Sequence, residues 1–255
     1  MRAQLIPEQV SWFEEIIKAV EQYDCHSHGN HSTGFFLKGA ARTGKTFVYN
    51  CLCSDLWAEG KIVCCVGLSG IPAQLLLGGQ TAHSWFKIPL SNAFHSGCNI
   101  TSSSPLTHLI RNTSLISWDE VPMQHESCLE AVNWTLNDNC HINNSSLFGI
   151  IPIVLDGNFG QILPVIRRGS QQATVQVCIQ HSSIWHSLHR LRLRTTMRIE
   201  ANNCNRIFIS FLKSLVNDST MYGKIAIPDC IHRVTSVDHL SDQRYRQASL
   251  FLLLL

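Results

Sequence analysis

The stretch from Phe35 to Gly60 constrains the folding of this 255-residue chain more than any other. It opens with the apolar run Phe35-Phe36-Leu37, passes through a loop of small residues and continues through residues 46–59 to Gly60. A short apolar run bounded by glycine is typical of a buried strand, and glycine commonly follows the last residue of a helix. The sequence therefore predicts a strand, a tight loop and a helix, in that order.

The loop between them reads Gly39-Ala40-Ala41-Arg42-Thr43-Gly44-Lys45-Thr46, which matches the pattern G-x-x-x-x-G-K-[ST] of phosphate-binding loops. Small residues let backbone N–H groups close around the phosphates of a nucleotide at the positive end of the next helix. Lys45 supplies a mobile charge for the phosphate oxygens, and the Thr46 hydroxyl can ligate Mg²⁺. We therefore predict that these eight residues bind ATP; the alternative is an ordinary glycine turn before a helix.

A second apolar run ends in two carboxylates. Leu115-Ile116-Ser117-Trp118 is followed directly by Asp119 and Glu120. Asp119 at the tip of a strand can hold Mg²⁺, directly or through water, and Glu120 can position and deprotonate an attacking water molecule. Because a kinase must keep water away from the γ-phosphate, this pair favours hydrolysis over transfer to another substrate.

Further apolar runs at residues 62–67 and 150–155 predict two more strands, although Pro152 is awkward in a central strand. Residues 7–22 carry apolar side chains at helical spacing. Strands that are apolar throughout require a sheet covered on both faces, and strands separated by helices indicate a parallel sheet. We expect an α/β fold of the P-loop NTPase class, with a parallel sheet flanked by helices.

The composition narrows the possible partners and compartments. The net charge is only +2, so any contact with nucleic acid must come from a local groove rather than from total charge. The eleven cysteines show no CxxC pair and no zinc-finger spacing, and Cys51, Cys53, Cys64 and Cys65 lie in apolar runs. We interpret these four as reduced core residues. The N-terminus shows no secretory signal, so we expect an intracellular protein without a membrane anchor.

Several segments carry a family pattern when they are taken together. They include Trp118-Asp119-Glu120-Val121-Pro122-Met123, Gly157-Asn158-Phe159-Gly160-Gln161-Ile162-Leu163-Pro164-Val165, and residues 5–9, 69–73, 78–89 and 195–199. From about Leu5 to about Pro228 the chain resembles the Pif-type (petite integration frequency) DNA helicases of superfamily one, especially those associated with Helitron transposons. The resemblance implies a RecA-like motor domain, ATP-dependent DNA unwinding in repair, recombination or telomere maintenance, and a nuclear location.

The resemblance also implies roles on the ATP side of the motor. Gln9 would contact the adenine, and the alternative is a helix-capping segment with an exposed glutamine. Gln161 would sense the γ-phosphate. Arg198 would reach the ATP across the cleft between two motor domains, where an arginine stabilises transition-state charge.

On the DNA side, the resemblance places single-stranded DNA against residues 69–73 and 78–89. The candidate contacts are Ser69, Gly70, Thr81, His83 and Ser84. Hydroxyls and backbone amides there can meet phosphates, and an aromatic ring offers a stacking face. Of Trp85 and Phe86, we expect at least one to lie in the core.

The chain departs from the family pattern at several points. Arg42 stands where the family usually has glycine, Asn158 replaces an aspartate, and Gly160 replaces an arginine. The last two departures bear on the coupling of hydrolysis to DNA more than on ATP binding. After Pro228 the family pattern is lost, so we expect a motor domain at residues 1–200 and the start of a truncated second domain at 201–255. The alternatives are a non-catalytic remnant of such a helicase and an unrelated P-loop ATPase.

Overall fold

The computed structural model describes residues 1–25, 33–39, 43–89, 97–140, 146–160, 163–166, 168–195, 207–208, 210–211, 214–215 and 226–228. The chain divides into two compact units, Met1–Arg198 and Ile199–Leu255. In the second unit, the hydroxyl of Ser214 donates a hydrogen bond to the carbonyl of Phe211 at 2.8 Å. The helices and strands given below belong to the first unit.

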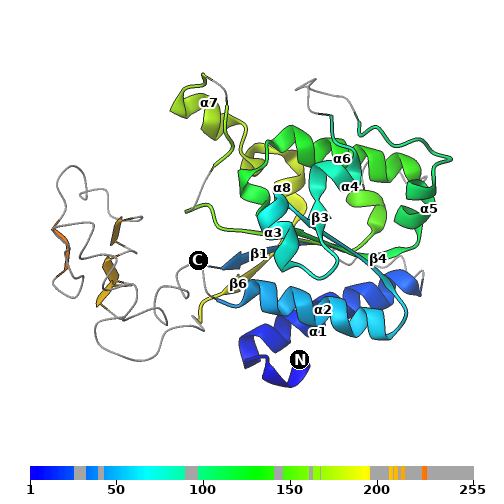
Figure 1. Ribbon diagram of the computed structural model, residues 1–255, viewed down its shortest axis with the longest axis horizontal. Coiled ribbons are helices and arrows are strands. Elements are labelled where there is room, and N and C mark those ends of the chain that lie inside the picture. Colours follow the sequence, from blue (N-terminus) through cyan, green and yellow to red (C-terminus); the bar gives the residue numbers. More distant parts are fainter. Residues whose placement is uncertain are drawn as a thin grey trace, which may run out of the picture. The chain divides into compact units, whose positions relative to one another are not determined.

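A six-stranded sheet forms the centre of the first unit (Figure 1). Its strands are β1 (Gly34–Gly39), β2 (Ile62–Gly67), β3 (Gln80–Thr81), β4 (Thr113–Asp119), β5 (Ile153–Gly157) and β6 (His189–Leu193). They lie in the order β3-β2-β4-β5-β1-β6, and each neighbouring pair is parallel. With helices packed on both faces, this arrangement confirms the predicted α/β class with a RecA-like parallel sheet.

Helices cover the sheet on both sides. On one face lie α1 (Pro7–Asp24) and α2 (Lys45–Ala58), and on the other α4 (Ala82–Phe86), α5 (Pro105–Arg111), α6 (Glu126–Asn139) and α8 (Ser183–Ser187) (Figure 1). The remaining helices are α3 (Gly70–Leu75), α7 (Gln171–Gln176) and four short 3-10 turns at Arg2–Gln4, Val121–Met123, Phe148–Ile150 and Ile179–His181. Among the described residues, no helix combines the length and the hydrophobicity needed to cross a bilayer.

Two buried clusters explain why the strands are apolar throughout. Successive side chains of a strand point to opposite faces, so Phe35 and Leu37 pack with α1 and α2, whereas Phe36 packs on the opposite side. Burial on both faces therefore leaves little room for polar residues in the central strands. Cys51, Cys53 and Cys65 are buried in the cluster on the side of α1 and α2, and Cys64 is buried in the cluster on the opposite side of the sheet. Both placements confirm that these cysteines lie in the core.

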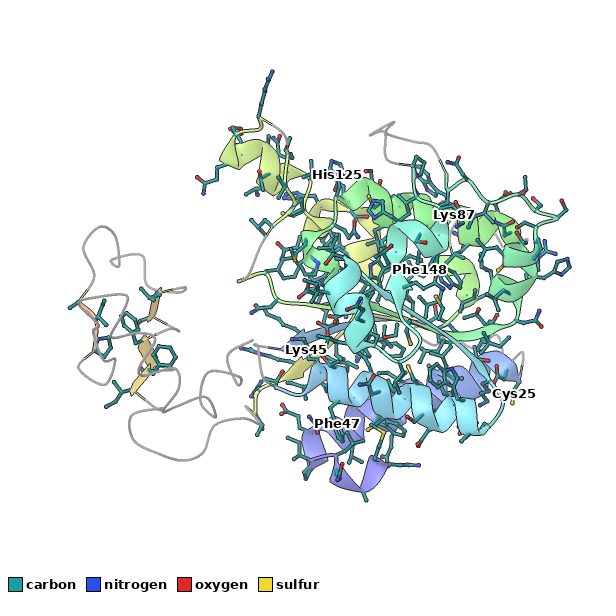
Figure 2. All side chains as sticks on the ribbon, in the orientation of Figure 1. Cys25, Lys45, Phe47, Lys87, His125 and Phe148 are labelled. Atoms are coloured by element: carbon teal, nitrogen blue, oxygen red, sulfur yellow. The ribbon has the colours of Figure 1, made fainter. Side chains whose placement is uncertain are left out.

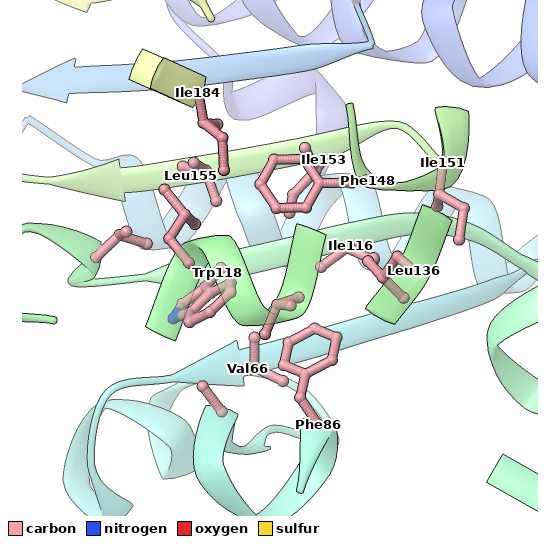
Figure 3. Close-up of a cluster of buried hydrophobic side chains, with 14 of the residues drawn as sticks. Val66, Phe86, Ile116, Trp118, Leu136, Phe148, Ile151, Ile153, Leu155 and Ile184 are labelled. Atoms are coloured by element: carbon pink, nitrogen blue, oxygen red, sulfur yellow. The ribbon is translucent and has the colours of Figure 1, made fainter. Parts of the chain in front are cut away.

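Trp118 is the largest side chain at the centre of the cluster under α4 and α6 (Figure 3). Its ring packs on Phe86 with 5.3 Å between the ring centroids, and Phe86 in turn contacts the partly buried Trp85 at 4.7 Å. Phe86 is fully buried, which confirms that at least one of this aromatic pair lies in the core. The pair therefore ties α4 to the tip of β4.

The expected strand at residues 150–155 begins three residues too early. Residues Phe148–Ile150 form a 3-10 turn, and β5 starts at Ile153. The side chains of Asn133 and Asn137 on α6 accept hydrogen bonds from the amides of Phe148 and Gly149, each at 2.7 Å, and so hold the turn out of the sheet. Pro152, which has no N–H for a ladder, lies before the strand and uses its carbonyl to accept from Ile116 at 2.9 Å.

Replacing Gly157 with alanine is expected to destabilise the fold by about 1–3 kcal/mol, the range typical of overpacking. Gly157 is the last residue of β5, and a Cβ atom there would overlap the ring of Pro122. Urea unfolding of G157A should show this loss as a lower midpoint. Gly70→Ala is the matched control, because a Cβ at Gly70 meets nothing within 4 Å. Equal midpoints for G157A and the wild type would contradict the prediction.

Candidate functional site

The carboxyl ends of β1, β4 and β5 meet at one edge of the sheet, because all three strands are parallel and neighbours. The phosphate loop leaves this edge after Gly39, and the acidic pair leaves it at Asp119. Ligands of open α/β sheets bind at such carboxyl ends. The order of strands therefore brings together two motifs that are far apart in the sequence, with the end of β5 between them.

The described part of the phosphate loop, Gly39 and residues 43–46, has features that favour anion binding. Gly44 lies in the left-handed region with φ 81°, and Thr43 is buried against Gly39, where a Cβ atom would approach the Thr43 hydroxyl to 2.6 Å. Helix α2 starts immediately afterwards, with neither a side-chain cap nor an acidic residue in its first turn. Its first N–H groups are thus left for a phosphate. Ala40, Ala41 and Arg42 lie outside the described residues.

Lys45 is the first residue of α2, and its side chain is held against the sheet edge (Figure 2). Its ammonium donates a hydrogen bond to the carbonyl of Gly39 at 3.0 Å and lies 3.8 Å from Oδ1 of Asp156. The side chain is only 14% exposed. Lys45 therefore lies across the base of its own loop, within reach of any phosphate bound there. Thr46 follows it in the first turn of α2, where its hydroxyl can face the same ligand.

Gln9 links the N-terminal segment to this loop. Its Nε2 donates to the carbonyl of Thr43 at 3.1 Å, and its Oε1 accepts from the amide of Ile6 at 3.2 Å. The alternative of a capping segment with an exposed glutamine holds only in part, because Gln9 caps α1 but is fully buried. The contact with adenine stays a prediction.

The two acidic residues differ in burial and in backbone geometry. Asp119 ends β4 and is 9% exposed; burial raises the pKa of this carboxyl, against the opposing effect of Lys45. Glu120 is half-buried, and burial followed by the nearby charge of Asp119 raises its pKa. Its backbone is left-handed with φ 58°, a strained conformation for glutamate. Such strain clusters at functional sites, where it aims a side chain.

Asp156 is a member of the site that the sequence reasoning missed. It lies on β5 and is 1% exposed, and the buried hydroxyl of Tyr49 lies close enough to its carboxyl to favour the ionised form. Burial and then the charge of Asp119 raise its pKa well above the usual range, while Lys45 opposes the shift. The available signal is a charged residue near the end of an apolar strand, the feature that also marks Asp119 at the end of β4.

The candidate DNA contacts come from two segments that the sheet joins. Residues 66–67 of β2 pair with residues 80–81 of β3, so Ser69 and Gly70 lie beside the start of α4. Ser69, Gly70 and Ser84 are exposed, and the Thr81 hydroxyl caps α4 by accepting from the amide of Ser84 at 3.3 Å. Burial lowers the pKa of the half-buried His83. The segments that carry them follow β2 and β3, whose carboxyl ends lie on the same side of the parallel sheet as that of β1.

Two predicted residues, Gln161 and Arg198, lie outside the described part of the chain. The segment before Gln161 is described: the Asn158 side chain accepts a hydrogen bond from the amide of Gly160 at 3.0 Å. The Asn158 oxygen thus caps this turn, as an aspartate oxygen could, and Gly160 contributes only its backbone amide at these two departures from the family pattern. Their effect on coupling stays a prediction.

Known proteins with related sequences and folds complete the description of the site. The family model of the PIF1-like helicases matches residues 4–219. The ATP-dependent DNA helicase Pif1 of Psychrobacter sp. (strain PRwf-1) is 32% identical over 137 residues, which are 52% of this chain and 20% of that protein. The crystal structure of Pif1 helicase from Candida albicans matches with a TM-score of 0.66 at 21% identity, over 95% of this chain and 54% of that chain.

A similar fold occurs in Bacteroides Pif1 helicase in complex with ADP-AlF3 and single-stranded DNA. That structure matches with a TM-score of 0.60 at 19% identity, over 89% of this chain and 56% of that chain. The present chain therefore spans about a fifth of its curated relative and about half of the solved chains. Because the family model covers most of its length, the chain belongs to the PIF1-like helicase family.

Proposed function

We propose that this chain is the ATP-binding motor part of an ATP-dependent DNA helicase. The observation that carries the proposal is the meeting of Lys45 and Asp119 at one sheet edge, within electrostatic range of each other. The Psychrobacter relative is named an ATP-dependent DNA helicase, and the Bacteroides structure holds ADP-AlF3 and single-stranded DNA. In the proposed arrangement residues 1–200 are the motor domain, and 201–255 begin a second one.

ATP fits the described loop through its phosphates. The backbone of residues 39–46 and the start of α2 would surround the β- and γ-phosphates, and Lys45 would neutralise part of their charge. Gln9, which already braces Thr43, would lie on the adenine side. Gln161 and Arg198 are proposed to report the state of the γ-phosphate.

Magnesium also fits the donors at this edge. Asp119 is a buried carboxylate and Thr46 offers a hydroxyl, and Mg²⁺ on a nucleotide needs only one or two such protein ligands. No three His, Cys, Asp or Glu residues of the described segments group as a metal site, so here a cation would depend on the nucleotide for further oxygen ligands. When bound, Mg²⁺ offsets charge on the phosphate oxygens.

Glu120 is proposed as the residue that positions the attacking water and accepts its proton. Its raised pKa makes the carboxylate a stronger base than an exposed glutamate. Its left-handed backbone conformation ends the extended path of β4 at this residue. Hydrolysis therefore depends on Glu120 for the proton and on Lys45 for the phosphate charge.

Single-stranded DNA is the proposed partner, with Ser69, Gly70, Thr81, His83 and Ser84 as contacts. These residues carry hydroxyls and amides rather than clustered charge, in keeping with the low net charge of the chain. By its family, the proposed setting is DNA repair, recombination or telomere maintenance in the nucleus.

An ATPase assay with and without single-stranded DNA at low salt tests the proposal. We expect turnover that rises with DNA and weakens again as salt is added, because phosphate contacts release counterions. An ATPase rate that is the same with and without single-stranded DNA would indicate an unrelated P-loop ATPase. Nucleotide binding without turnover under either condition would indicate a non-catalytic remnant of a helicase.

A further inference from the structure

The carboxyl ends of β1, β4 and β5, where we propose that the nucleotide binds, hold one more carboxylate than the proposed reaction uses. Asp119, Glu120 and Asp156 all interact electrostatically with the single ammonium of Lys45. An ATP molecule brings several further negative charges to the same place. Asp156, as the most buried of the three carboxylates, is the one that solvent screens least.

The strand register explains why Asp156 faces Lys45. Asp156 pairs with Leu37 on β1, and it directly follows Leu155, which pairs with Trp118 on β4. Val154, two residues earlier, packs under α1 and α2, so Asp156 points to the same face of the sheet. The carboxylate therefore lies between the strand that carries the phosphate loop and the strand that carries Asp119.

The contact between Lys45 and Asp156 orients the ammonium without saturating it. The 3.8 Å separation is too long for a hydrogen bond, so the contact is Coulombic. Among the described residues, Gly39 takes one of the three N–H donors of Lys45. The ammonium is thus held by two groups at the sheet edge and still has donors for a phosphate.

We propose that Asp156 is a positioning residue that holds Lys45 and makes nucleotide affinity depend strongly on a divalent cation. Its carboxylate competes with the phosphates for the Lys45 ammonium and repels them across a buried site. A divalent cation that arrives with the nucleotide offsets this repulsion, and the phosphates then take over Lys45. The inference rests on the proposed function, because it requires that ATP bind at this edge.

The test measures the dissociation constant of a fluorescent ATP analogue for the whole chain at alkaline pH, where Asp156 is ionised despite the burial that raises its pKa, once with excess Mg²⁺ and once with EDTA. In D156N, which keeps the shape of the side chain but removes its charge, affinity in EDTA is expected to rise about tenfold, equivalent to about 1.4 kcal/mol. Affinity with Mg²⁺ should change less than about threefold, since the cation already offsets the charge. The ratio of the dissociation constant in EDTA to that with Mg²⁺ is therefore expected to be about tenfold smaller in D156N than in the wild type.

Matched variants separate this role from a structural one. D138N removes an exposed carboxylate on α6 and should keep the wild-type ratio, whereas D156S should shrink it as D156N does. D156E, which restores the charge, should return the ratio towards that of the wild type. An unchanged ratio in D156N, equal losses of affinity in both conditions, or failure of both neutral variants to fold would overturn the inference. If the wild type bound no nucleotide in either condition, the proposed function itself would fail instead.

Discussion

Lys45→Ala is expected to weaken ATP binding at least about a hundredfold and to remove measurable turnover. The side chain lies at the base of the phosphate loop, with its ammonium bound to Gly39 and close to Asp156. Hydrogen bonds to charged groups contribute about 1.5–3 kcal/mol, and about 2.7 kcal/mol corresponds to a factor of a hundred in affinity. Removing the ammonium also takes away the positive charge with which Asp119, Glu120 and Asp156 each interact.

Isothermal titration of ATP with Mg²⁺ into the wild type and K45A measures this effect. Lys18→Ala is the matched control, because Lys18 is an exposed lysine on α1 and outside the phosphate loop. The control should bind ATP as the wild type does. Equal affinities for K45A and the wild type would remove Lys45 from the site, and the assignment of the loop would fall with it.

Glu120→Gln is expected to keep ATP affinity within about threefold and to lower turnover by about 10²- to 10⁴-fold, the usual contribution of a general base. Glutamine has almost the same shape as glutamate, so the left-handed turn at this position and the neighbouring Asp119 can keep their places. What the variant lacks is the carboxylate that accepts a proton from water. Binding and hydrolysis should therefore separate in this protein, unlike in K45A.

Single-turnover measurements with radiolabelled ATP report hydrolysis in E120Q independently of product release. Glu126→Gln serves as the control, since Glu126 is a partly exposed glutamate in the first turn of α6, outside the proposed site. Wild-type hydrolysis in E120Q would show that another group accepts the proton. A large loss of affinity in E120Q would show instead that Glu120 holds the nucleotide or its metal.

Local sequence patterns were sufficient to predict the strands, the loop and the helix that build the site. Residues 35–37 and 46–59 follow the patterns of a buried strand and a helix, and the loop between them is fixed by its glycines and its lysine. Asp119 and Glu120 stand out because charge follows an apolar run. Parallel strands align their carboxyl ends, so these short-range patterns alone were enough to predict that the two motifs meet.

Other elements carry weak local signals. Strand β6 alternates exposed His189, Arg190 and Arg192 with buried Leu191 and Leu193, as an edge strand does, and it was not predicted. Strand β3 has only two residues, too few for a periodic pattern. The start of β5 depends on hydrogen bonds that the side-chain oxygens of Asn133 and Asn137 accept, which no pattern in residues 148–155 reveals.

The sequence by itself determined which residues can bind a triphosphate and its metal, because the phosphate loop and the acidic pair are local features of a few residues each. Only the tertiary structure decided that Asp156 faces Lys45 and that Gln9 braces Thr43. The physical reason is that both contacts join strands or helices distant in the sequence, so they exist only once sheet order and register are set. The charge balance around Lys45, and with it the expected dependence on a divalent cation, is therefore a property of the folded sheet edge.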